Sequence, residues 1–230
     1  MTEDVVHRFF LEALDSTTEC PDVRSGFAVT GKELSELCAL LDADPLEIDA
    51  RFYYLEADVV ARLTQRFAIA FEPEEREVRL VPWNEHDALP YEVHTNRELA
   101  LMLRGTKPLA TFSERYPPNP DVEDIPERLF DPFVATGRFI KREYVIPSNR
   151  LGFVAVPGVQ GVRCVLYALI GQEWRIDALI LLEDAAYRSG WTETAVRLEG
   201  ALLGYESWQN DAYIEQIWRP WRARMASDGY

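Results

Sequence analysis

The sequence predicts an α+β fold: an acidic, mostly helical N-terminal region with a β-hairpin, followed by a small mixed sheet covered by C-terminal helices. Helix caps followed by apolar residues at helical spacing recur over residues 2–66 and again after residue 172. Short apolar segments bounded by Pro and Gly lie between these two stretches. The 230 residues are 47% hydrophobic and 27% charged, which is typical of a chain that buries a full core.

In the N-terminal region, each expected helix begins at a capping residue. Thr2 precedes the acidic first turn of one helix, Thr30 and Glu33 form a capping-box pattern, and Asp44-Pro45 resembles an N-cap followed by a first helical residue. The expected elements are a helix over residues 2–14, a helix over 32–41, a helix over 44–66, and a hairpin of 67–71 with 77–81.

The second region alternates between short strands and helices. Thr95 and Gly105 delimit one helix, Gly137 ends another, and Pro220 is expected to kink or end the last one. The expected elements are strands over 91–94, 109–112, 139–146, 151–156 and 162–170, and helices over 95–104, 126–136, 172–188 and 193–203 and after Ser207.

The charge is unevenly distributed along the chain. Residues 1–85 hold 19 acidic and 8 basic residues, and the remaining 145 hold 20 and 16, within a net charge of −15. This difference predicts two regions, 1–85 and 86–230. It makes nucleic acid an unlikely partner and argues against an anionic membrane surface. The acidic face either maintains solubility or docks a basic partner, including the chain's own cationic C-terminal segment.

Two short helices around residues 42–44 would resemble a helix-turn-helix. The second carries Glu47, Asp49, Glu56 and Asp58 against Arg51 and Arg62. A recognition helix needs the opposite charge to approach phosphates. Glu47 and Asp49 are therefore candidate residues for binding a basic protein.

The cysteine pattern indicates a cytoplasmic protein. Cys20, Cys38 and Cys164 are odd in number and widely spaced, which fits neither a disulfide framework nor a zinc ribbon. The acidic start is not followed by a signal-type apolar run, and the longest apolar stretch, 164–170, is too short to cross a membrane. The spacing of the histidines matches no metal-binding motif, and the sequence contains no phosphate-loop motif. We therefore expect neither a metal nor a cofactor.

Cys164 and His94 are the candidate catalytic pair. Cys164 lies in the apolar segment 162–170, and His94 ends the segment 91–94. A nucleophilic cysteine needs a base within hydrogen-bonding reach and a lowered pKa. The pair would support acyl transfer or hydrolysis; the alternative is that Cys164 is inert packing in a strand.

Arg175 and the tryptophans are the candidate binding residues. Arg175 is expected on the apolar side of its helix, where it would hold an anionic ligand or pair with a neighbouring carboxylate. The tryptophans combine large area with one donor, which suits binding sites as well as helix packing. Those singled out are Trp174, Trp208, Trp218 and Trp221, the last two within a cationic-aromatic tail.

Two functional hypotheses follow. The first is a non-catalytic protein-binding module of the immunity, antagonist or adaptor type, whose acidic face engages a basic protein or a second copy of the chain. The alternative is a small-molecule enzyme, a transferase or hydrolase, using the Cys/His pair and an anion-holding arginine.

Overall fold

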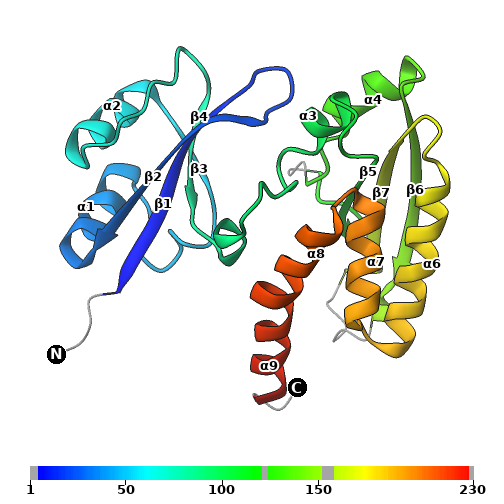
Figure 1. Cartoon of the computed structure of the whole chain (residues 1–230). Coiled ribbons are helices and arrows are strands. Elements are labelled where there is room, and N and C mark those ends of the chain that lie inside the picture. The colour runs from blue at the N-terminus through cyan, green and yellow to red at the C-terminus, as the bar shows by residue number, and fades with distance from the viewer. Residues whose placement is uncertain (1–4, 121–123, 152–157, 228–230) are drawn as a thin grey trace. The chain divides into compact units, whose positions relative to one another are not determined.

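The computed structural model describes residues 5–120, 124–151 and 158–227, which form α-helices and two antiparallel β-sheets (Figure 1). The α+β class is therefore confirmed. The chain divides into two compact units, Met1–Ala88 with Thr95–Arg97 and Leu89–His94 with Glu98–Tyr230. The main division lies three residues after the boundary expected at Glu85. Across the described ranges, every helix is too short or too polar to cross a bilayer.

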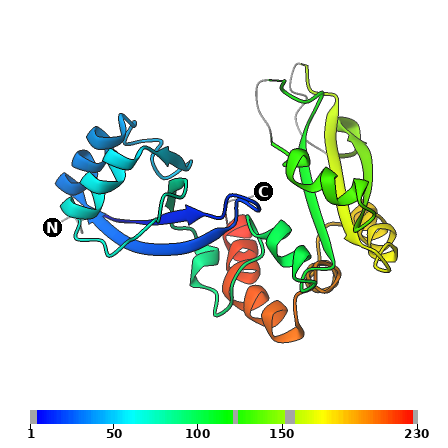
Figure 2. The same cartoon turned by 90° about the horizontal axis from the view of Figure 1, so that it is seen from above.

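The first unit is a four-stranded antiparallel sheet with two helices packed on one face (Figures 1 and 2). Phe9 and Leu11 of the sheet pack with Leu37 and Leu63 of the helices, and all four are fully buried. The strand order is β2-β1-β4-β3, and the elements are β1 Val6–Leu14, β2 Pro21–Thr30, α1 Gly31–Leu41, β3 Tyr53–Leu55, α2 Ala57–Arg66 and β4 Val78–Pro82, followed by the 3-10 turn Glu85–Ala88.

This sheet corrects the expectation of a mostly helical N-terminal region. Residues 6–14 form a strand because Phe9, Leu11 and Ala13, two residues apart, all face the core. Phe10 lies on the opposite face, where the Arg24 guanidinium carbon is 3.5 Å from its ring centroid. Apolar residues on both faces of β1 produce a spacing that also matches a helix.

Two further expectations for this unit are wrong. The helix expected over 44–66 is a series of turns, strand β3 and then α2, because Tyr53 and Leu55 pair with Leu80 and Val78 of β4. The hairpin expected for 67–71 with 77–81 does not form, since 67–71 is not a strand and β4 pairs with β1 and β3 instead. The helix expected over 32–41 is confirmed as α1.

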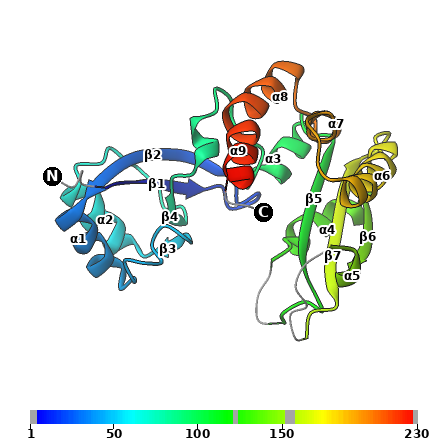
Figure 3. The same cartoon turned by 90° about the horizontal axis from the view of Figure 1, so that it is seen from below.

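The second unit contains a three-stranded sheet, β5-β7-β6, which is antiparallel throughout rather than mixed. Helices α3 and α4 pack on one face and α6 and α7 on the other (Figure 3). The elements are α3 Glu98–Leu103, β5 Leu109–Tyr116, α4 Glu127–Ala135, β6 Phe139–Pro147, α5 Ser148–Leu151, β7 Gly161–Leu169, α6 Trp174–Ser189 and α7 Glu193–Leu203.

The strand expected over 91–94 does not form, and of the one expected over 151–156, residues 152–156 lie outside the described residues. The chain ends in α8 Ser207–Tyr213, a π-helical turn Ile214–Trp218 and α9 Arg219–Ser227. Pro220, the second residue of α9, does not end this helix, because α8, the π-helical turn and α9 follow one another without a break and a π-helical turn can accommodate the hydrogen bond that proline cannot make. The π-helical turn lies directly before α9.

Candidate functional site

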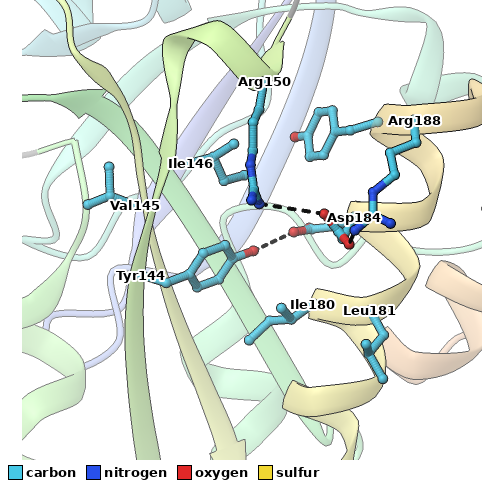
Figure 4. A pocket seen from close by; sticks show the side chains of 10 residues that line it. Tyr144, Val145, Ile146, Arg150, Ile180, Leu181, Asp184 and Arg188 are labelled. Atoms are coloured by element: carbon cyan, nitrogen blue, oxygen red, sulfur yellow. Dashed lines mark hydrogen bonds and ion pairs between the residues drawn. The ribbon is translucent and has the colours of Figure 1, made fainter.

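A pocket of about 610 Å³ lies between the outer strand β6 and helix α6 (Figure 4). We call it the β6–α6 groove. Its walls are largely apolar, with charged groups at one end. It is lined by Tyr144, Val145 and Ile146 of β6, Arg150 of α5, and Ile180, Leu181, Glu183, Asp184, Tyr187 and Arg188 of α6.

The groove includes the edge of β6 that faces away from β7, which pairs with no other strand among the described residues. Ser148 N donates to Gln160 O at 3.0 Å, and the same register continues through the β6–β7 ladder. Because hydrogen-bonded pairs alternate in an antiparallel ladder, the even-numbered residues of β6 bond to β7. The N–H and C=O of Val145 therefore point away from β7, and its side chain points away from the groove (Figure 4).

A hydrogen-bonded chain of three side chains reaches the groove from the sheet. Tyr144 and Cys164 are cross-strand partners, and their side chains are hydrogen-bonded. The Tyr144 hydroxyl in turn donates to Glu183 of α6. Burial raises the pKa of Glu183 and raises that of Cys164 to about 11, so Cys164 is a thiol at neutral pH.

The acidic groups of the groove differ in their partners. Asp184 pairs with Arg188 and, at 3.7 Å, with Arg150 (Figure 4). Glu183, in contrast, has the Tyr144 hydroxyl as its partner and no cation among the described residues. Glu199 of α7 also lacks a cation there, and burial together with the charge of Glu183 raises the pKa of Glu199 to about 7.

The two candidate catalytic residues have separate partners. His94 Nδ1 is 3.5 Å from Lys107 Nζ, and its ring stacks on Tyr205 with centroids 3.9 Å apart. Burial, and then the charge of Lys107, lower the pKa of His94 to about 4, so its imidazole is neutral. Among the described residues no hydrogen bond joins His94 to Cys164. Their catalytic role stays a prediction.

Arg175 caps a helix. Its Nη1 donates to the carbonyl oxygens of Ala201 and Leu202, at 2.8 and 3.0 Å, at the C-terminal end of α7. Its Nε donates to Gln172, and its guanidinium carbon is 4.8 Å from the Trp174 ring centroid. Carbonyls thus take the place of the carboxylate that the sequence suggested as its partner.

The other candidate binding tryptophans lie on the C-terminal helices. Trp208 donates to Glu206 and packs edge-on against Tyr91 at 5.5 Å. Trp218 stacks with Arg222 at 5.7 Å, and Trp221 is 42% exposed.

The acidic candidates of the first unit are paired. Glu47 forms an ion pair with Arg51, and Asp49 lies 2.7 Å from His7 Nδ1. Within the described ranges, no three His, Cys, Asp or Glu side chains converge as a metal site would require.

Sequence reasoning missed Glu183 and Tyr144, although a signal for each exists. Glu183 follows the buried Ile176 and Leu179 by seven and four residues, which places a carboxylate on the apolar face of α6. Tyr144 shares its strand face with Ile146. Comparison of the chain with family models, curated proteins and solved structures finds no match.

Proposed function

We propose that this chain is a non-catalytic protein-binding module that takes an extended segment of a basic partner protein along the outer edge of β6, beside α6. One observation carries the proposal: three consecutive residues of an outer strand line a largely apolar groove whose other wall is a helix.

Strand addition suits this geometry. An added strand would bond to the outward N–H and C=O groups of Val145 and would present alternate side chains to the α6 side of the sheet. Main-chain hydrogen bonds then supply affinity, and the groove supplies specificity for the side chain that enters it.

Binding is favoured over catalysis by the state of Cys164. A nucleophilic cysteine needs a lowered pKa and an adjacent base, whereas burial raises the pKa of Cys164 and its hydrogen-bond partner is Tyr144.

The acidic surface of residues 1–85 has a role in this proposal. An excess of 11 negative charges there attracts a basic partner over long range and accelerates its association. Association with such a partner should slow as salt is raised, because exposed charges are screened within about 8–10 Å at physiological ionic strength.

Selection from a phage-displayed library of random dodecapeptides tests the proposal. We expect the chain to enrich peptides that Val145→Pro binds about tenfold or more weakly, because proline removes an outward N–H that the β6–β7 ladder does not use. Val145→Thr keeps that N–H and should bind like the unmodified chain.

A second pair of variants tests the helix wall. Leu181 lines the groove and is 70% exposed, while Leu198 of α7 is 51% exposed and is not among the residues that line it. Leu181→Glu should weaken binding and Leu198→Glu should not. Enrichment of no peptide, or of peptides insensitive to both Val145→Pro and Leu181→Glu, would overturn the proposal.

A further inference from the structure

We infer that the segment bound in the β6–α6 groove presents a lysine, whose aliphatic stem lies on the apolar walls and whose ammonium group reaches Glu183. This inference rests on the proposed function and names the side chain that the groove selects.

The first argument is the unmet charge of Glu183. Its carboxylate lines the groove, is half-buried, and accepts a hydrogen bond from the Tyr144 hydroxyl. A carboxylate can accept about four hydrogen bonds, and one that leaves water without a cation is costly. No described residue supplies that cation, so a ligand that brings one removes the cost.

An anionic ligand fits the groove less well. It would have to bind Arg150 and Arg188, whose side chains are 68% and 74% exposed and are both paired with Asp184 already. Ion pairs at such exposed positions contribute little because solvent screens them. The charge left unsatisfied in the groove is therefore negative.

Lysine matches the shape and the acceptor better than arginine does. Ile146, Ile180 and Leu181 provide apolar surface for a flexible four-carbon stem. A guanidinium pairs best with a carboxylate whose two oxygens are both free, whereas Tyr144 already occupies Oε2 of Glu183. An ammonium group is a point charge and needs one oxygen.

The surroundings of Glu183 predict that binding releases protons. It is faced by Tyr144 of β6, Cys164 of β7, Tyr187 of α6 and Glu199 of α7, and by Arg150 and Asp184 at the mouth of the groove. None of these supplies a free cation, and Glu199 is partly protonated near neutral pH. A bound ammonium group favours the ionised forms of Glu183 and Glu199, so affinity should rise between pH 6 and pH 8.

Calorimetry with synthetic copies of an enriched dodecapeptide tests the inference. The copies carry lysine, norleucine or ε-acetyl-lysine at the critical position, and norleucine keeps an aliphatic stem while removing the charge. We expect each replacement, and separately Glu183→Gln, to weaken binding about tenfold or more. Combining the norleucine peptide with Glu183→Gln should weaken binding no further than either change alone, because both changes remove the same ammonium–carboxylate interaction.

Asp184→Asn is the matched control, because Asp184 is the adjacent acid but already has two arginine partners. It should change affinity less than threefold. The lysine peptide should also release protons on binding to the unmodified chain at pH 7, which is measured in two buffers of different ionisation enthalpy.

The outcomes separate the two proposals. If peptides bind in a manner sensitive to Val145→Pro but tolerate norleucine and Glu183→Gln, the lysine inference is wrong and the peptide-binding function stands. If the library yields no peptide for the groove, the proposed function fails and the inference fails with it. The peptide replacements need no change in the protein, so they remain decisive even if Glu183→Gln folds poorly.

Discussion

A buried carboxylate of the first unit and a half-buried carboxylate of the second have opposite surroundings. Glu12, in the strongly acidic first unit, is 4% exposed and lies 2.9 Å from both Arg24 and Arg79. Glu183, in the less acidic second unit, has no cation among the described residues. The unit with the larger net charge thus neutralises its buried acid internally, while the other retains an unpaired acid in a groove. Net charge along the chain therefore indicates long-range attraction but does not locate a site.

The same contrast recurs between the two faces of the second sheet. On the α4 face, Arg163 binds Glu114, Glu127 and Glu143, and its hydrogen bonds lower the pKa of Glu127 to about 2. On the α6 face, burial raises the pKa of Glu183. The second unit can pair its acids with cations, so a carboxylate that lacks a cation among the described residues is a local property of the groove.

Removing the paired carboxylate of Glu12 should have the largest effect on the free energy of unfolding. Glu12→Gln leaves the buried Arg79 without its counter-charge, and we expect a loss of about 3–5 kcal/mol in the free energy of unfolding, measured by urea denaturation. Glu47→Gln, in the exposed Glu47–Arg51 pair, should cost only about 0–1 kcal/mol. Equal losses in the two variants would show that burial does not make the ion pairs of Glu12 more important for stability than an exposed pair of the same unit.

Removing Glu199, an acid without a cation among the described residues, should instead increase the free energy of unfolding. The pKa of Glu199 is about 7 in the folded chain against an ordinary 4.5, so its ionisation destabilises the fold as pH rises from 4.5 to 7. Glu199→Gln should therefore gain up to about 3 kcal/mol at pH 8 and almost nothing at pH 4, measured by urea denaturation.

Glu127 provides the control for this pH profile. Its pKa is lowered, so its stabilisation is present above pH 4.5 and is lost as pH falls toward 2. Glu127→Gln should destabilise the chain at pH 7 and have little effect near pH 2. A gain at pH 8 in both variants would contradict the contrast between the two faces.

Sequence reasoning identified elements whose ends carry local signals. The helix expected over 193–203 is α7, because the Thr192 side chain accepts from Ala195 N and Gly204 adopts φ 97°. The strands expected over 139–146 and 162–170 are β6 and β7 within one residue at each end. The β1 strand was missed because its apolar residues occupy both faces.

The site was harder to predict than the fold. Its β6 and α6 walls are 34 or more residues apart in sequence and meet only through packing of α6 on the sheet. The outer position of β6 in the described sheet follows from the strand order, which no local pattern encodes. The readable signals were a carboxylate on the apolar face of α6 and a tyrosine on the strand face that carries Ile146.

A smaller loss of stability is expected when Arg175 no longer caps the C-terminal end of α7. Arg175→Met removes the bonds to the Ala201 and Leu202 carbonyls and should cost about 1–2 kcal/mol in the free energy of unfolding. Arg188→Met, on the same helix but 74% exposed, should change it by less than about 0.5 kcal/mol. Similar values for both would show that capping of α7 is not needed for stability.

The smallest effect is expected for Cys164 and His94, the pair suggested as catalytic: replacing His94 should hardly change the rate at which the Cys164 thiol is alkylated. Cys164 is 6% exposed and its pKa is about 11, so iodoacetamide at pH 7.5 should label it slowly, like the buried Cys20 and Cys38. His94→Ala should change this rate less than twofold, because His94 contacts Lys107 and Tyr205 rather than the thiol. Labelling in urea, where burial is lost, shows that each thiol can react. Fast labelling of Cys164 in the folded chain, abolished by His94→Ala, would instead indicate that Cys164 is a nucleophile and His94 its base. That result would favour an enzymatic function of the second unit over the proposed binding function.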